Sequence, residues 1–381
     1  MKKVVGVIVN EDVESGLLST QFISPLLFLK ENGYTVGVLN ICKPWKRPVN
    51  NNINIRNIPI AIPAKFFMFN PLSFLFVPLS AFFYALILLF FVKKDVTYLV
   101  RSYYPSYIFA LIKFFKPNLK FIFDSRSLFV DEYVGAGKIK PDSFNYKVWR
   151  KIEFYILRQS HKTLVVASKQ EKIYRSIYPE TSIEKVPCYT EVDLSVDFFK
   201  TDMLDQFNIP KHKVLICYFG SIDKGWNNIE RYKKFLDANH ENQNLHFIFI
   251  SQNYRQLQNT IEFNQGNLTL IPVDVSLADK KRLMTQCDYG LFLMGPNPDW
   301  ETRLGVKFVD YCASGLPVII SPYVGEAVNY IQQNEILEHS CKILEHDLLQ
   351  NVIKTEVALK KQIQIFSLEF FSYKNLIRNF N

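Results

Sequence analysis

The sequence lacks the marks of several protein classes. Its six cysteines are far apart and form no C-x-x-C pair, so neither a zinc site nor a disulfide framework is predicted. The opening MKKVVGVIVN runs straight into a strand pattern and has no small-residue cleavage site of a signal peptide. There is no internal repeat of solenoid period and no low-complexity linker. We therefore expect a globular protein of a reducing, cytoplasmic compartment.

Acidic residues are scarce in the first half of the chain. Residues 1–190 contain 26 Lys and Arg against 13 Asp and Glu, whereas residues 191–381 contain 19 against 23. Two domains with different partners would produce such a split. A basic half suits an anionic surface, either nucleic acid or lipid head groups. Because no helix-turn-helix, zinc-knuckle or RNA-recognition signature is present, nucleic acid is not expected as a partner.

Strand and helix patterns alternate along both halves. Short apolar runs separated by stretches of helical spacing begin at residue 4 and recur to residue 167, and a second series runs from residue 214 to residue 320. This alternation predicts two α/β domains, each an open parallel sheet with crossover helices, joined near residues 187–210. In such sheets ligands bind beyond the carboxyl ends of the strands.

Residues 71–92 (PLSFLFVPLSAFFYALILLFFV) contain no charge and are about long enough to cross a bilayer. A span would place strands of one sheet on opposite sides of the membrane, and Pro78 would leave only residues 79–92 as a single helix. We favour a helix that lies in or against the membrane interface; a protein-buried crossover helix and a true span are the alternatives. The lysines and tyrosines that follow suit anionic head groups, or else form a solvated basic face.

The strongest site signal lies in residues 301–317 (ETRLGVKFVDYCASGLP). A helix is predicted over residues 302–313, with Gly305 in its first turn and Gly315 ending it. Free N–H groups at its start would bind a diphosphate. Lys307 and Asp310 share one helical face, so Lys307 can meet the phosphates and Asp310 a ribose diol. An ordinary solvated pair on a helix surface is the alternative.

The run R-L-G-V-K-F-V-D-Y-C-A-S-G-L-P-V-I resembles the donor helix of GT-B glycosyltransferases of family 4 (glycosyl transferases group 1), which is often S-P-T-K-F-G-E-Y-L-A-x-G-x-P-V-I. The resemblance implies that Lys307 is the phosphate-binding lysine and Asp310 the ribose-binding carboxylate. Other members carry E-x-F-G-x-x-x-x-E. Against that version Gly305 and Asp310 match, Thr302 stands at the first glutamate, and Glu301 lies one residue before it.

Further matches follow in the family's order. The segment VLICYFGSIDKGWNNIERY resembles the G-R-x-x-x-x-K-G loop: Gly220 and Lys224 keep the glycine and the lysine, and Ser221 replaces the arginine. Lys224 would then reach the donor diphosphate from the side opposite the donor helix; a solvated turn lysine is the alternative. In SPYVGEAVNYI, Gly325 and Glu326 are expected to border the donor.

The first half offers a different pair of candidates. The segment FIFDSRSLFVDE resembles the family's D-x-R-G-x-x-x-D-E loop, and no histidine occurs before His161. Asp124 and Arg126 are therefore the catalytic candidates. Arg126 would contact the donor or acceptor, and Asp124 would orient an acceptor hydroxyl or accept its proton. A pair that only shapes the loop is the alternative.

The resemblance covers nearly the whole chain and implies a GT-B fold, an α/β architecture of two Rossmann-like domains facing across a cleft. The implied parts are an acceptor-side domain (residues 1–190), a donor domain (residues 191–360) and a C-terminal helix (residues 361–381) that crosses back to the first domain. The last of these rests on the stretch from Phe366 to Phe380, which resembles the final helix of GT-B enzymes.

The implied activity is that of a glycosyltransferase, specifically a hexosyltransferase, which takes a sugar from a nucleotide-diphosphate sugar with retention of configuration. No cofactor and no metal are expected, since no Asp-x-Asp motif is placed to hold a divalent ion. The basic, aromatic first half adds the expectation of peripheral contact with the inner face of the cell membrane. A glycan or polyprenyl-linked acceptor of bacterial surface polysaccharide (O-antigen or capsule) synthesis would suit that position. A nucleotide-sugar epimerase on the same fold and a non-catalytic glycosyltransferase-like partner subunit are the alternatives.

Overall fold

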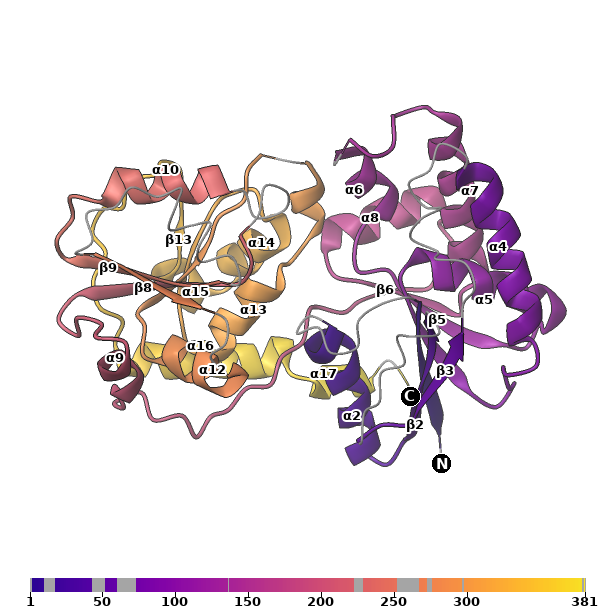
Figure 1. Ribbon diagram of the computed structural model, residues 1–381, viewed down its shortest axis with the longest axis horizontal. Helices are drawn as coiled ribbons and strands as arrows, with labels where there is room; N and C mark the ends of the chain where they lie inside the picture. Colours follow the sequence, from indigo (N-terminus) through magenta and orange to yellow (C-terminus); the bar gives the residue numbers. More distant parts are fainter. Residues whose placement is uncertain are drawn as a thin grey trace. The chain divides into compact units, whose positions relative to one another are not determined.

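The computed structural model describes residues 2–9, 18–42, 52–59, 73–135, 137–222, 229–251, 267–272, 276–296, 298–378 and 380. The chain forms two compact units, each built on its own parallel sheet (Figure 1). Unit 1 comprises Met1–Tyr189 and Tyr373–Asn381, and unit 2 comprises Thr190–Ser372. This architecture confirms the predicted α/β class with two Rossmann-like domains.

The sheet of unit 1 has seven parallel strands. Their spatial order is β3 (Ile55–Pro59), β2 (Thr35–Cys42), β1 (Lys3–Val9), β4 (Thr97–Arg101), β5 (Lys120–Asp124), β6 (Lys162–Val165) and β7 (Ile183–Lys185). The chain moves outward from β1 to β3 and then returns past β1 to β4. The sheet therefore has a topological switch point between β1 and β4.

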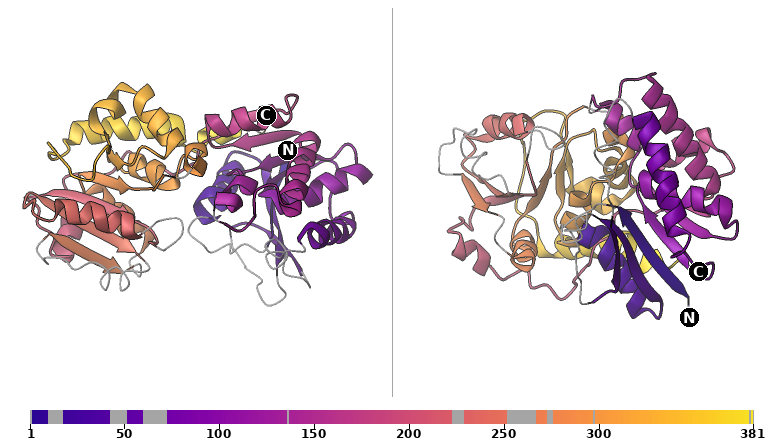
Figure 2. Two further views of the ribbon diagram at one scale, coloured as in Figure 1. Left: turned by 90° about the horizontal axis from the view of Figure 1, so that it is seen from above. Right: turned by 45° about the vertical axis from the view of Figure 1, so that its right-hand side comes forward.

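Helices cover both faces of this sheet. On one face lie α4 (Ser73–Leu88), α5 (Tyr103–Phe115), α6 (Phe129–Gly135) and α7 (Phe144–Gln159); on the other lie the π-helix η1 (Ser19–Ile23), α2 (Ser24–Glu31) and the short α17 (Lys374–Ile377) (Figure 1, Figure 2). The remaining helix, α8 (Ser168–Ile177), joins β6 to β7. Coverage on both faces explains why the central strands are almost wholly apolar.

Side chains of β1 alternate between two cores, as the pleat of a strand requires. Val7 belongs to the core under α4, α5 and α7, and Ile8 to the core under η1 and α2. Phe22 and Leu26 approach β1 so closely that a Cβ at Gly6 would lie 2.6 Å from Leu26 Cδ1. The glycine in the run KVVGVIV is therefore a packing requirement.

The sheet of unit 2 has six parallel strands. Their order is β10 (Leu268–Pro272), β9 (Leu245–Ser251), β8 (Val214–Phe219), β11 (Tyr289–Phe292), β12 (Val318–Ile320) and β13 (Lys342–Ile343). The accompanying helices are α9 (Asp202–Gln206), α10 (Ile229–Asn239), α12 (Leu277–Thr285), the 3-10 helix η2 (Pro298–Thr302), α13 (Val306–Ala313), α14 (Gly325–Gln333), α15 (Glu335–Ser340) and α16 (Val357–Phe371). Here the switch point lies between β8 and β11.

Three helical expectations need correction. The helix predicted over residues 302–313 is two elements, η2 and α13, because Gly305 has a φ of 80° and so lies outside the right-handed helix. The helix expected over residues 361–381 is likewise two helices, α16 and α17. They are separated at Ser372, whose backbone is extended and bridges to Thr190. Finally, α4 continues through Pro78 from Ser73 to Leu88, so the proline does not divide it.

The continuity of α4 has a packing explanation. A proline inside a helix removes one hydrogen bond, and here α4 packs along both α5 and α7, which offsets that loss. Within the part of the chain that the structure describes, no helix combines the length and apolar character needed to cross a membrane.

Candidate functional site

Lys307 lies at the switch point of the unit 2 sheet. Its ammonium group sits 5.4 Å from the ring centre of Tyr218 at the end of β8 and 5.8 Å from that of Phe292 at the end of β11. A Cβ at Gly220 would lie 2.7 Å from Lys307 Cε, so the lysine side chain passes directly over this glycine. Gly220 also has a φ of 140°, which disfavours any other residue. Two predicted residues, Gly220 and Lys307, are therefore neighbours.

The N-terminus of α13 opens beside this lysine. Gly305 is its N-cap and offers no side chain to the free N–H groups of the first turn. A Cβ at Gly305 would lie 2.4 Å from the Phe292 ring, so the glycine lets the helix start against the end of β11. The N–H groups of the first turn of a helix have no carbonyl partner within that helix, so they and the positive end of the helix dipole make this place suitable for an anion.

Tyr311 fixes α13 to the sheet. Its hydroxyl accepts a hydrogen bond from the Phe219 N–H at 3.1 Å and donates one to the Leu291 carbonyl at 3.2 Å, which joins the ends of β8 and β11. A Cβ at Gly290 would lie 2.3 Å from the Tyr311 ring, so the ring occupies the space over that glycine. No motif indicated Tyr311 or Gly290, because neither role has a signal along the sequence.

Asp310 lies one turn along α13 from Lys307 and is partly buried. Burial raises its pKa from 3.8 to about 6, although a hydrogen bond from the Thr190 side chain and the charges of Lys281 and Lys307 act in the opposite direction. A carboxyl group with a pKa near 6 is ionised for the most part at neutral pH, and so it can accept hydrogen bonds from hydroxyl groups.

Glu301, Gly325 and Glu326 form a second group of predicted residues. A Cβ at Gly325 would lie 2.7 Å from the Glu301 carbonyl oxygen, so these backbones touch, while the Glu301 side chain is exposed. Glu326 is buried, and its N–H donates to the Arg303 carbonyl at 3.3 Å. The Arg303 guanidinium lies 4.6 Å from the ring centre of Trp300. Arg303, which no motif indicated, thus connects this group to the start of α13.

The loop after β8 is described only in part. Ser221 is half-buried, and its carbonyl accepts a hydrogen bond from the Tyr218 hydroxyl at 2.7 Å. Lys224, the predicted second phosphate ligand, lies outside the described residues.

In unit 1, Asp124 and Arg126 occupy the carboxyl end of β5. The Arg126 Nε lies 2.8 and 2.9 Å from the two carboxylate oxygens of Asp124, and Arg101 Nη1 lies 3.7 Å from the same carboxylate. Arg126 Nη2 donates to the Gln21 carbonyl at 2.8 Å. The charge of Asp124 holds the pKa of Arg126 above its usual value in spite of burial. Arg126 also has a φ of 58°, so this loop is held in an unfavourable conformation.

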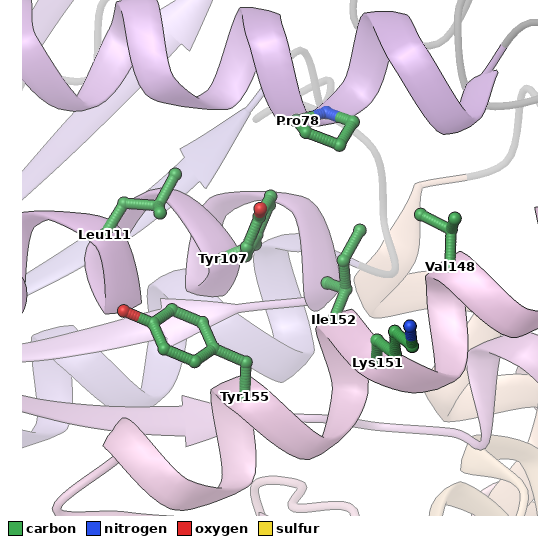
Figure 3. A pocket seen from close by; sticks show the side chains of 7 residues that line it. All are labelled: Pro78, Tyr107, Leu111, Val148, Lys151, Ile152 and Tyr155. Carbon is green, nitrogen blue, oxygen red and sulfur yellow. The ribbon is translucent and has the colours of Figure 1, made fainter.

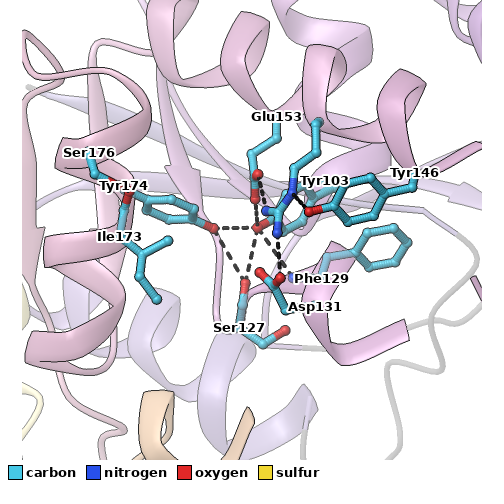
Figure 4. A network of polar contacts seen from close by, with 10 residues as sticks. Tyr103, Ser127, Phe129, Asp131, Tyr146, Glu153, Ile173, Tyr174 and Ser176 are labelled. Carbon is cyan, nitrogen blue, oxygen red and sulfur yellow. Dashed lines mark hydrogen bonds and ion pairs between the residues drawn. The ribbon is translucent and has the colours of Figure 1, made fainter. Parts of the chain in front are cut away.

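A buried polar network contacts the residues that follow Arg126 in this loop (Figure 4). The Tyr103 hydroxyl donates to Glu153 Oε1 at 2.8 Å and accepts from the Phe129 N–H at 3.3 Å. The hydroxyls of Tyr103 and Tyr174 bond to each other, and both lie within reach of the Ser127 carbonyl. Burial raises the pKa of Glu153, against the charge of Arg150. The loop that contains Asp124 and Arg126 is therefore fixed at its following residues, Ser127 and Phe129.

No family model and no curated protein matches this chain. Solved structures match over its full length. One is the UDP-forming α,α-trehalose-phosphate synthase from Burkholderia xenovorans in complex with glucose-6-phosphate, with a TM-score of 0.71, 11% identity and 100% of both chains covered.

Two other solved structures are similar over 100% of this chain. Sucrose-phosphate synthase from Thermosynechococcus elongatus has a TM-score of 0.65 and 12% identity, with 97% of that chain covered. An E. coli trehalose-6-phosphate protein bound with UDP-2-fluoro glucose has a TM-score of 0.67 and 10% identity, with 99% of that chain covered. At these identities the likeness establishes the fold, and it confirms the predicted GT-B architecture.

Proposed function

We propose that this chain is a glycosyltransferase that takes a sugar from a nucleoside-diphosphate sugar. The observation that carries the proposal is the position of Lys307, over Gly220 and next to the N-terminus of α13, at the switch point between β8 and β11. Ligands of open α/β sheets bind at such points, and a helix N-terminus with a lysine suits a diphosphate. A solved structure of the same fold is bound with UDP-2-fluoro glucose.

In this proposal the residues of unit 2 stabilise the leaving group. Lys307 and the N–H groups of the first turn of α13 hold the diphosphate, whose negative charge grows as the bond to the sugar breaks. Asp310 accepts hydrogen bonds from the ribose hydroxyls. Gly325 and the partly buried turn around Arg303 border the sugar. Departure of the diphosphate and attack by the acceptor on one face of the sugar would retain its configuration, and no metal or covalent nucleophile is then required.

The acceptor side is assigned to unit 1. We propose that Arg126 contacts the donor or acceptor and that Asp124, through its ion pair, fixes the direction of the Arg126 side chain. A glycan or polyprenyl-linked acceptor of bacterial surface polysaccharide synthesis agrees with the basic charge of the first half of the chain, as does a position at the inner face of the cell membrane.

A thermal-shift screen over a panel of nucleoside-diphosphate sugars tests the proposal. A ligand at 100 times its dissociation constant stabilises the native state by about 2.7 kcal/mol, so a true donor raises the melting temperature. Lys307→Ala and Asp310→Ala should lose this shift. Lys234→Ala, which removes an exposed lysine of α10 in the same unit, should keep it.

Two further measurements on the same samples distinguish a glycosyltransferase from an epimerase and from a non-catalytic subunit. Incubation with the donor alone should release little nucleoside diphosphate and no epimer; an epimer would mean an epimerase. Addition of an acceptor extract should release nucleoside diphosphate, and donor binding without any turnover would mean a non-catalytic subunit. If both the Lys307 and the Asp310 variants bind donor as the unmodified protein does, the assigned site is wrong.

A further inference from the structure

We propose that unit 1 docks on the surface of an anionic lipid bilayer through one defined surface, which we call the α4 face. It consists of the exposed apolar side chains of α4 (Leu75, Leu79, Phe82, Phe83 and Leu86) and the exposed cations of α7 next to them. This docking does not depend on the chemistry proposed at Lys307, and it identifies the surface by which membrane contact occurs.

Helix α4 is apolar on both of its sides. The side toward the core carries mainly small residues, among them Val77, Ala81 and Ala85, which are at most 1% exposed. The outer side carries larger ones: Leu79 is 62% exposed and Phe83 is 51% exposed. The exposed positions recur at helical spacing and form one stripe. Helices that are apolar all round are ordinarily covered on every side, so this outer stripe requires an apolar partner.

The stripe continues past the end of α4. Phe90 is 90% exposed, and Phe114, near the end of α5, is 76% exposed. Lys116 holds the two ends together, because its ammonium group donates to the carbonyls of Leu89 at 2.7 Å and Val92 at 2.6 Å. The two exposed phenylalanines therefore lie at the same end of the α4 face.

Cations border the stripe on the side of α7. Phe144 at the start of α7 packs edge-on against Phe74 of α4, with ring centres 4.8 Å apart. Lys147, Lys151 and Arg158 follow on the exposed side of α7. The acid of this helix, Glu153, is buried and paired with Arg150, so it does not offset these charges at the surface. An apolar stripe with a basic border matches the hydrocarbon and the anionic head groups of a bilayer.

A shallow hollow lies between the three helices (Figure 3). It has a volume of about 280 Å³ and opens between Pro78 of α4, Leu111 of α5 and Ile152 of α7, with the exposed Lys151 among its lining residues. A phospholipid presents a hydrocarbon chain next to a phosphate. The hollow presents an apolar surface next to an ammonium group, which is the complement of that pair.

Two alternatives, a dimer that buries the α4 face and a helix α4 that spans the bilayer, agree less well with the charges of this face and with the length of α4. In a two-fold dimer both copies would bring the lysines of α7 to the same interface, which would concentrate like charges there. A helix of 16 residues is roughly 24 Å long, which is shorter than the hydrocarbon thickness of about 30 Å. A bilayer surface attracts the cations and accepts a helix that lies parallel to it.

Sedimentation of the full-length protein with vesicles tests the proposal. Vesicles of phosphatidylcholine alone are compared with vesicles that also contain phosphatidylglycerol, at low and high salt. Leu79→Glu/Phe83→Glu should reduce binding to the anionic vesicles at least about tenfold. Lys147→Glu/Lys151→Glu should reduce binding to anionic vesicles only. Phe199→Glu and Lys234→Glu, which change exposed residues of unit 2, are the matched controls and should bind as the unmodified protein does.

The outcomes discriminate between occupants. Equal sedimentation of the unmodified protein and Leu79→Glu/Phe83→Glu overturns the proposal. An absence of vesicle binding by the unmodified protein also overturns the proposal. Light scattering would then show whether the unmodified protein is a dimer that the Leu79→Glu/Phe83→Glu substitutions separate, in which case a second copy covers the α4 face. The donor-induced thermal shift of Leu79→Glu/Phe83→Glu should be unchanged, so failure of docking and failure of the proposed donor site are distinguishable.

Discussion

The carboxyl edges of the two sheets hold their cations in different ways. In unit 2 the ammonium group of Lys307 lies over two aromatic rings, and the carboxyl of Asp310 stands one helical turn away with a raised pKa. In unit 1 the guanidinium of Arg126 is bound directly to the buried carboxylate of Asp124, with Arg101 close by. The unit 1 cation forms a direct ion pair, whereas the unit 2 cation lies against aromatic rings.

This difference suggests a division between binding and positioning. A cation on aromatic rings gains attraction without neutralisation, so its charge still acts on an approaching phosphate. A cation paired with a buried carboxylate has lost most of that field, and removal of either partner exposes the other to a low dielectric. Substitutions at the unit 2 edge should therefore affect mainly function, whereas those at the unit 1 edge should also lower stability.

The largest effect is expected for Lys307→Ala. Loss of a cation aimed at a developing negative charge should lower the transfer rate roughly 10²–10³-fold. The unfolding free energy should change by less than about 1 kcal/mol, because the side chain lies over a glycine and is only partly buried. Initial rates with donor and acceptor, together with urea denaturation of the same samples, measure both quantities. Lys234→Ala is the control.

If Lys307→Ala transferred sugar at a rate within threefold of the unmodified protein, the proposed difference between the two sheet edges would be wrong, since the unit 2 edge would then not act on the leaving group. A large loss of stability would also contradict this difference, because the lysine would then be a structural residue.

The opposite pattern is expected for Arg126→Met, which keeps much of the side-chain volume. It removes the cation in direct contact with the buried Asp124 and leaves Arg101 Nη1 at 3.7 Å, so the unfolding free energy should fall by about 3 kcal/mol. The double variant Asp124→Asn/Arg126→Met removes both charges and should regain part of this loss. Urea denaturation gives the stabilities. Unchanged stability of Arg126→Met would remove the proposed difference between the two edges, because the ion pair with Asp124 would then contribute nothing to the fold.

Much of the fold could be predicted because buried parallel strands are continuous apolar runs. The strands β1, β2, β4, β8, β9 and β11 agree to within two residues at either end with apolar runs that the sequence pattern indicated. The strands at or near the sheet edges, β3 (IRNIP), β7 (IEK) and β13 (KI), are short and carry polar residues, so no apolar run indicates them. Their pairing depends on the strand beside them, which only the folded sheet supplies.

Only part of the candidate site could be predicted from the sequence. Lys307, Gly220 and Gly305 are neighbours in the structure, and their motifs indicated each of them. Tyr311 was not indicated, because an aromatic residue on a helix is ordinarily a core residue, and its bonds to Phe219 and Leu291 arise only when β8 and β11 lie side by side. The start of α13 was missed because Gly305 fits a helical pattern in sequence, although its backbone is left-handed.

Tyr311→Phe tests whether the unit 2 edge is held by this hydroxyl. The change leaves the Phe219 N–H and the Leu291 carbonyl without their hydrogen-bond partner, so the unfolding free energy should fall by about 2 kcal/mol. Because α13 would then be less firmly fixed, donor affinity should fall as well. Tyr323→Phe, at an exposed position in the same unit, is a matched control for loss of a tyrosine hydroxyl. Equal stability of Tyr311→Phe and the unmodified protein would mean that packing over Gly290 alone fixes α13.

The smallest effect is expected for Asp310→Asn, which should raise the unfolding free energy and not lower it. Burial raises the folded-state pKa of Asp310 from 3.8 to about 6, so the folded state binds this proton more tightly than the unfolded state does. The contribution of Asp310 to the unfolding free energy is therefore fully present below about pH 4, where the carboxyl is protonated in both states. This contribution is lost as the pH rises to about 6. Asparagine does not titrate. Above pH 6 the variant should be more stable than the unmodified protein by about 1 kcal/mol, a value reduced for the partial exposure of the group.

Melting temperatures between pH 4 and pH 8 measure this difference, with Asp237→Asn, an exposed position of α10, as the control that should show none. The same variant should bind the donor less well, because an amide is a weaker acceptor for a diol than a carboxylate. A gain in stability coupled to a loss in binding is what a residue retained for a ligand would produce. A stability difference that is as large at pH 4 as at pH 8 would assign the effect to packing, and the contrast between the two sheet edges would then rest on Lys307 alone.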